Sequence, residues 1–223
     1  MRFQALLILS TAALGAAFAA VAQVPAMGAM TSDGLARVES AGFDEFYLRP
    51  KTDLAGYRKV MVDPAQVSMK QGWLKHINST KDVTRWITAM DVKRIIDGAN
   101  QTLEGSVTRA FRGRGYEIST APGPGVLRLS PSVPDLWLNA PDIQAADPAR
   151  FASVDAGDAT LILEARDSVS GAVLARVVDR NTARQTFRLN PTTTTSNVFW
   201  FQMIFESWAT KCAREFEAVQ AQP

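Results

Sequence analysis

Cysteine and histidine are nearly absent from this chain of 223 residues, in which Cys212 is the only cysteine and His76 the only histidine. One cysteine cannot form an intrachain disulfide, so packing must stabilise the fold. A His-based zinc site or a Ser-His-Asp triad would depend on His76, and no neighbouring motif supports either. The sequence also lacks G-x-S-x-G, a phosphate-binding glycine loop, H-E-x-x-H and Cys-x-x-Cys. We therefore name no catalytic residue, no metal ligand and no cofactor.

An excess of charge of one sign is also missing. The chain has 24 basic and 22 acidic residues, a formal net charge of +2, and the two kinds are interspersed. The tightest basic cluster, Arg109, Arg112 and Arg114, lies where a long helix is expected to end, and cations favour a helix C-terminus. The sequence therefore predicts no binding of nucleic acid.

The first 22 residues have the pattern of a secretory signal peptide. Arg2 is a short basic region, Ala5 to Leu14 is apolar, and Ala20-Val21-Ala22 is a small-residue cleavage motif before Gln23. The apolar part is shorter than the ~20 residues that span a bilayer, so we expect no transmembrane segment in the mature chain. No cysteine stands at the cleavage point, which excludes a lipoprotein anchor of that kind. The sequence predicts a periplasmic or secreted protein.

After a tether over residues 23–52, residues 53–220 are predicted to form one α/β domain. The first core strand is Arg58 to Met69, at an edge or bulged at Pro64, and a long amphipathic helix from Thr88 to Phe111 packs against it. The helix then leads to a strand at 116–120 that should pair in parallel with the first, because such crossovers are right-handed.

Three further elements complete the predicted domain. The short PGPG link suggests that the next strand, interrupted and bulged at Pro131 and Pro134, runs antiparallel to the strand at 116–120. A hairpin follows in DATLILEARDSVSGAVLARVVDR, with charged side chains paired on its polar face. A terminal helix begins near Ser196 or Asn197 and buries Cys212. The expected fold is α/β (α+β), with a mixed sheet of about five strands and two long helices on one face.

Two connections are candidate binding surfaces. The loop before the long helix holds Trp73, His76 and Trp86, which would form an aromatic platform with a titratable group. The alternative is that both tryptophans fold under the loop and His76 is solvated. The second connection, Asn139 to Gly157, is much longer than usual, and such loops commonly carry function.

Four motifs in order carry a resemblance to a known family. They are DLAGYRKVMVDP (53–64), PGPGVLRL (122–129), LILEARDSVSGAVLARVVDR (161–180) and FESWATKCAREFE (205–217). Together they resemble the bacterial domain of unknown function 3313 family. The resemblance implies an exported envelope protein, often a lipoprotein in that family, with no established activity to carry over. The missing lipobox cysteine puts membrane anchoring of this chain in doubt.

Two classes of function stay open from the sequence. The first is a non-enzymatic binding or assembly module of the envelope, whose partner would be another envelope protein. The second is a hydrolase that acts on envelope glycan or peptide through two carboxylates. The first predicts exposed apolar or aromatic patches, and the second predicts a cleft with close carboxylates of perturbed pKa. The absence of common catalytic motifs favours the binding module.

Overall fold

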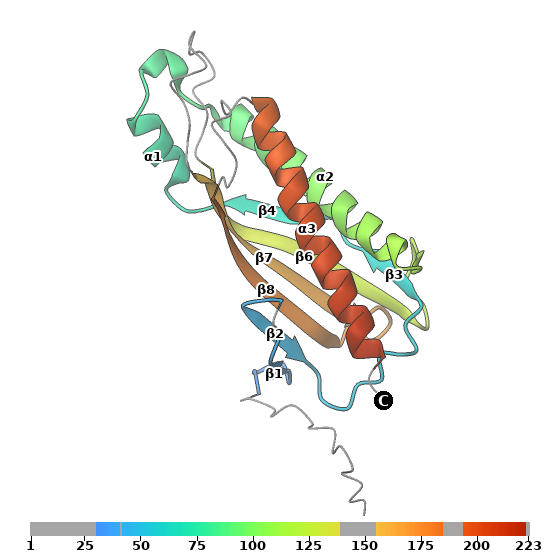
Figure 1. The fold of residues 1–223 in the computed structure, drawn as a ribbon. Coiled ribbons are helices and arrows are strands. Elements are labelled where there is room, and N and C mark those ends of the chain that lie inside the picture. Colours follow the sequence, from blue (N-terminus) through green and yellow to red (C-terminus); the bar gives the residue numbers. More distant parts are fainter. Residues whose placement is uncertain (1–29, 41, 139–154, 185–193, 222–223) are drawn as a thin grey trace, which may run out of the picture.

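The structure is a computed structural model that describes residues 30–40, 42–138, 155–184 and 194–221 (Figure 1). The predicted signal peptide and residues 139–154 of the long connection lie outside the described residues. The helices are α1 (Trp73–Ser79), the short 3-10 helix η1 (Val83–Arg85), α2 (Ala89–Gly113) and α3 (Thr194–Gln220). The strands are β1 (Ala36–Val38), β2 (Glu45–Leu48), β3 (Lys59–Val62), β4 (Gln66–Met69), β5 (Glu117–Ile118), β6 (Val126–Leu138), β7 (Asp155–Asp167) and β8 (Val173–Arg184).

All eight strands belong to one mixed sheet with the order β1-β2-β8-β7-β6-β3-β5, and β4 also pairs with β6. Pairing is parallel between β3 and β5 and between β6 and both β3 and β4, and antiparallel elsewhere. The predicted α/β class, single domain and mixed sheet are confirmed. The expected number of about five strands is too low. One reason is that the first predicted strand is split into β3 and β4 around Pro64, which cannot donate a ladder hydrogen bond.

The other two additional strands come from the segment that we assigned to a tether. Strand β2 pairs with β8, and β1 pairs with β2 at the edge of the sheet. Phe43 and Phe46 are buried in the core, and the Arg49 Nε donates to the carbonyl of Val173 at 2.6 Å. The described part of this segment, from Met30 onward, is therefore attached to the sheet along much of its length.

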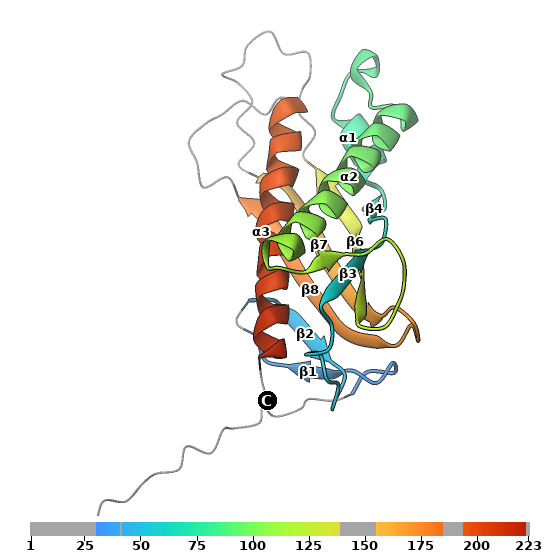
Figure 2. The same cartoon turned by 90° about the vertical axis from the view of Figure 1, so that its right-hand side faces the viewer.

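Helices α2 and α3 lie side by side over one face of the sheet, as predicted (Figures 1 and 2). The Thr88 hydroxyl accepts from the Asp91 N–H at 3.2 Å, and the Asp91 carboxylate accepts from the Thr88 N–H at 2.9 Å. This capping box starts α2 where the sequence predicts. The buried positions of α2 and α3 follow the helical repeat: Ala99, Leu103, Val107, Phe111, Phe205, Trp208, Cys212 and Phe216.

The crossover from β3 through α2 to β5 is parallel, as predicted, but the direction expected for β6 is wrong. Strand β6 lies on the other side of β3 and runs parallel to both β3 and β5. The reason is the shortness of β5, which has only two residues. The chain climbs less than about 7 Å along β5, so the short link can return to the level of Lys59 and start a parallel strand.

The predicted bulge in β6 and the predicted hairpin are both present. The register of β6 against β7 shifts between Ser132 and Trp137. Strands β7 and β8 pair along almost their whole length, and on the face away from the helices Glu164 accepts a hydrogen bond of 2.7 Å from Arg176. The shift in β6 turns Trp137 to this open face, while Leu136 and Leu138 stay buried.

Candidate functional site

The segment between β4 and α2 folds into α1 and η1, where the sequence predicted a loop. We call this end of the molecule, residues 70–97, the α1 end. Figures 1 and 2 show α1 and η1 projecting beyond the sheet. The Asn78 side chain joins the two pieces, because it accepts from the Ile87 N–H at 2.9 Å and donates to the Ile87 carbonyl at 3.0 Å. This pair of bonds sets the path of the chain into the Thr88 cap of α2.

Trp73 lies inside the protein and not on the predicted surface. Its side chain is 1% exposed, and its Nε1 donates to the carbonyl of Leu138 at 2.7 Å. Leu138 is the last residue of β6, so the indole attaches α1 to the end of the sheet. A buried tryptophan with a satisfied N–H is a structural residue.

His76 is exposed on α1 and contacts a tryptophan that the sequence did not single out. The rings of His76 and Trp137 have centroids 5.1 Å apart and planes inclined at 49°. The Lys70 Nζ lies 5.9 Å from the centroid of the same indole, within cation–π distance. Trp137 is half-buried and presents part of its ring at this end of the open sheet face. The predicted β6 bulge is the signal that would have located Trp137 there.

Trp86 is exposed, as the surface hypothesis requires. Its side chain is 51% exposed, and its Nε1 donates to the carbonyl of Lys81 at 3.3 Å. Val83 and Met90, in the same short stretch, are 70% and 75% exposed. We call Val83, Trp86 and Met90 the η1 tip. The structure therefore separates the three predicted site residues: Trp73 is in the core, His76 pairs with Trp137, and Trp86 belongs to the η1 tip.

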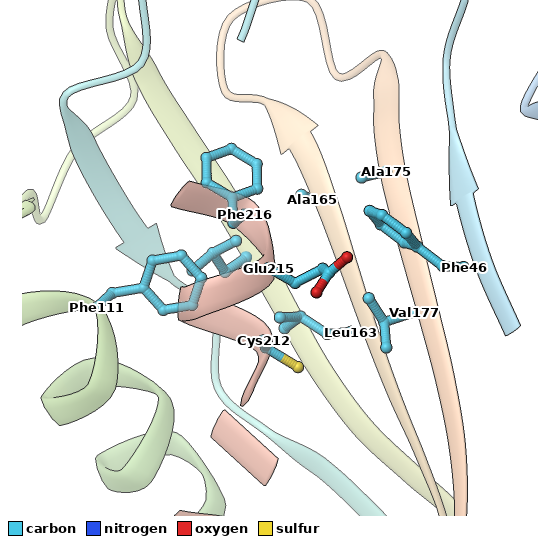
Figure 3. Close-up of a pocket in the computed structure, with 10 residues that line it drawn as sticks. Phe46, Phe111, Leu163, Ala165, Ala175, Val177, Cys212, Glu215 and Phe216 are labelled. Atoms are coloured by element: carbon cyan, nitrogen blue, oxygen red, sulfur yellow. The ribbon is translucent and has the colours of Figure 1, made fainter. Parts of the chain in front are cut away.

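A pocket lies between α3 and the sheet, away from the α1 end (Figure 3). Its lining is apolar except for Glu215 and the Cys212 thiol. Figure 3 shows the Glu215 carboxylate directed toward Phe46 and Val177. Burial raises the pKa of the Cys212 thiol well above its usual value, so the sulfur stays protonated and is a poor nucleophile.

Acidic side chains on the open sheet face are held in ion pairs and hydrogen bonds. Glu45 accepts from the Tyr47 hydroxyl at 2.7 Å and from the Arg180 guanidinium at 2.9 Å, and these donors lower the pKa of its carboxyl. The Thr31 hydroxyl, followed by Arg176, lowers the pKa of the Asp33 carboxyl. Such shifts keep a carboxylate ionised at neutral pH and unsuited to act as a general acid.

The one buried acid of the described residues, Asp179, is also paired. The Lys211 Nζ of α3 lies 3.0 Å from its carboxylate and also donates to the carbonyl of Gly42 at 2.6 Å. This contact ties α3 to β8 and to the segment before β2. Nowhere in the described ranges do three or more His, Cys, Asp or Glu side chains gather as a metal site would require.

The described helices do not meet the requirements of a membrane span. None of them, over residues 30–40, 42–138, 155–184 and 194–221, has the length and apolar character needed to cross a bilayer.

Several solved structures match this chain at low similarity. A PelC dodecamer from Paraburkholderia phytofirmans is 12% identical, with a TM-score of 0.39, over 74% of this chain and 96% of that one. Protein XCC0632 from Xanthomonas campestris is 15% identical, with a TM-score of 0.42, over 74% and 86%. A minor lipoprotein from Acinetobacter baumannii is 12% identical, with a TM-score of 0.33, over 75% and 98%. At these scores the likeness carries no argument about this chain.

The sequence itself identifies the family. No curated protein matches the chain. The family model described as protein of unknown function (DUF3313) matches residues 25–212, which include the first three of the four motifs and most of the fourth. The resemblance carried by those motifs is thereby confirmed, and the chain belongs to the DUF3313 family of proteins of unknown function.

Proposed function

We propose that this protein is a non-enzymatic binding or assembly module of the bacterial cell envelope, and that the α1 end is its binding surface. The signal-peptide pattern of residues 1–22 supports export to the periplasm or the exterior. The observation that carries the proposal is the η1 tip, where Val83, Trp86 and Met90 present apolar side chains to solvent within eight residues of sequence. Exposed apolar groups that gather in one place mark interaction sites.

A second group of side chains, beside the α1 end, extends this surface. Trp137, contacted by His76 and lying near Lys70, supplies an aromatic face flanked by polar side chains at the end of the sheet. Aromatic side chains contribute large contact areas at little cost in conformational entropy, which is why they are enriched among the residues that dominate binding energy. His76 and Trp86 are therefore the two binding residues that we retain from the sequence, with Trp137 added and Trp73 assigned to the core.

The alternative, a carboxylate-dependent hydrolase, finds less support at the acidic residues. A glycosidase-type mechanism needs one carboxyl that stays protonated near neutral pH, which requires a raised pKa. The shifts that are resolved for carboxyls on the open face and at its margin, Asp33, Glu45 and Asp167, are all downward. These acids act as partners of arginine, hydroxyl and backbone N–H groups.

The binding proposal is tested by capture of envelope proteins on the immobilised exported chain. We expect capture to weaken at least about fivefold when Trp86 or His76 is replaced by Ala, with melting temperatures almost unchanged because both side chains are exposed. Val169→Ser is the matched control, since Val169 is an exposed apolar residue in the β7–β8 turn at the other end of the sheet.

Activity assays on cell-wall glycan and peptide substrates complete this test. Turnover that disappears when one carboxylate is replaced by its amide would overturn the proposal in favour of a hydrolase. The N-terminal sequence of the exported chain should begin at or near Gln23, and a membrane-retained product that keeps residues 1–22 would contradict the predicted localisation.

A further inference from the structure

We infer that the α1 end docks on an anionic phospholipid surface, with the η1 tip entering the headgroup region and the surrounding basic side chains lying over the lipid phosphates. This inference rests on the proposed function, because it assigns a partner to the same binding surface. Three properties of the α1 end carry it: the residue types of the tip, its local charge and its rigid attachment.

The η1 tip has the side chains of an interfacial membrane contact. Val83 and Trp86 are three residues apart in one 3-10 turn, in which the Trp86 N–H donates to the Val83 carbonyl at 3.3 Å. Side chains three residues apart in a 3-10 turn project from the same side of the helix. Met90 follows in the first turn of α2, pointing away from the core. The other large apolar side chains exposed in the described part of the chain, Met30, Val169 and Met203, lie in three separate elements or turns. Tryptophan favours the headgroup level of bilayers because its ring is apolar and its N–H is polar.

The stretch that carries the η1 tip is also basic. Residues 70–97 contain six basic residues, Lys70, Lys75, Lys81, Arg85, Lys93 and Arg94, and three acidic ones, Asp82, Asp91 and Asp97. This stretch therefore carries a net charge of +3 with His76 neutral, whereas the whole chain carries +2, which leaves −1 for all other residues. A negative surface therefore attracts this stretch more strongly than the other residues taken together.

The tip is held in place before any contact forms. Both ends of the η1 segment are fixed. On one side, Asn78 bonds to Ile87 and the buried Trp73 attaches α1 to the end of β6, and on the other side the Thr88–Asp91 capping box starts α2. A fixed segment loses little conformational entropy on docking, so a few inserted side chains suffice.

The size of the η1 tip by itself fits contact with a lipid surface. A stable protein interface covers about 800 Å² on each partner, around a well-packed centre. Three side chains at a projecting end provide a small contact of the kind used by peripheral membrane proteins, which combine shallow apolar insertion with basic residues. Electrostatic attraction then adds to a modest apolar contribution.

The test is flotation of the full exported chain with vesicles of phosphatidylcholine alone and of phosphatidylcholine with 30–40% phosphatidylglycerol, roughly the range of anionic content at which basic patches bind. We expect binding to the anionic vesicles only, with weakening as salt is raised from about 0.05 to 0.5 M. The triple variant Val83→Ser, Trp86→Ala and Met90→Ser should bind at least about tenfold more weakly, and Lys75→Glu several-fold more weakly. Val169→Ser should bind like the unaltered chain.

The possible results distinguish failure of the lipid inference from failure of the proposed binding function. Equal vesicle binding by the triple variant and the unaltered chain, or no binding to either vesicle, overturns the lipid inference. Far-UV circular dichroism and the melting temperature of each variant exclude loss of fold as the cause. Because the vesicles contain no protein, capture of an envelope protein that depends on Trp86 without vesicle binding would refute the lipid inference and leave the proposed binding module intact. Hydrolysis of a cell-wall substrate would instead refute the proposed function.

Discussion

Two tryptophans that are equally buried differ in one hydrogen bond, and this difference predicts opposite responses to the same substitution. Trp73 and Trp208 are each 1% exposed. The Trp73 Nε1 donates to the Leu138 carbonyl at 2.7 Å, whereas the Trp208 Nε1 is buried without a hydrogen-bond partner in the described part of the chain. Replacement by Phe removes the indole N–H and part of the ring at either position.

The loss of packing should be similar at the two sites, about 1–3 kcal/mol, because the same atoms leave an equally closed environment. Trp73→Phe additionally leaves the Leu138 carbonyl unsatisfied, which costs a further ~1–3 kcal/mol. Trp208→Phe removes an unpaired donor and recovers a desolvation penalty of similar size. The free energy of unfolding should therefore fall by about 2–6 kcal/mol for Trp73→Phe and stay within about 2 kcal/mol of the unaltered chain for Trp208→Phe.

The assay is urea unfolding followed by far-UV circular dichroism, which is insensitive to the loss of one indole fluorophore. With similar m values, the two midpoints compare stability directly. A difference of 2 kcal/mol corresponds to at least about 4 °C in melting temperature for a domain of this size. Trp86→Phe is the control for the ring change itself, since Trp86 is exposed, and it should cost less than ~0.5 kcal/mol. A Trp208→Phe variant as unstable as Trp73→Phe would refute the reasoning.

Three further predictions concern other parts of the core. Gly157 has φ +150, and a Cβ there would lie 2.1 Å from a backbone carbonyl oxygen of β6. Gly157→Ala should therefore lower the free energy of unfolding by about 3 kcal/mol or more, whereas Gly171→Ala, at a position with open space around it, should lower it by ~1 kcal/mol. Equal costs of the two substitutions in urea unfolding would contradict this prediction. Burial and a 2.9 Å hydrogen bond to Asp167 raise the pKa of Tyr57 to about 12. The folded state then holds the phenol proton more tightly than the unfolded chain, so the contribution of Tyr57 to stability should be complete below pH ~10 and be lost between pH ~10 and ~12. Tyr57→Phe should flatten this part of the plot of unfolding free energy against pH. An unchanged plot would refute the raised pKa of Tyr57. Cys212 is buried with a raised pKa, so a maleimide should label it only at the rate of unfolding, and fast labelling of the native chain would show that the helix opens locally.

The sequence by itself determined the elements whose signals are local. The apolar spacing along α2, its start at Thr88, the alternation along β7 and β8 and the apolar stripe of α3 each arise within one segment, and each is present in the structure. Helical and strand periodicity report which face of an element will be buried, because a side chain's direction is set by the backbone repeat. The burial of Cys212 follows from the same stripe. The order of four short motifs was enough to identify the family.

Only the tertiary structure decided which partner covers each face and where the exposed residues gather. Trp73 and Trp86 occur in the same polar segment. Trp73 is buried because its N–H reaches the Leu138 carbonyl, 65 residues away in sequence. Trp86 is exposed because η1 projects beyond the sheet. The direction of β6 depended on the two-residue length of β5, and the strands β1 and β2 had too few residues to show a repeat. Contacts between distant segments depend on how elements pack and not on any pattern within one element, so the His76–Trp137 pair and the η1 tip emerge only after the chain has folded.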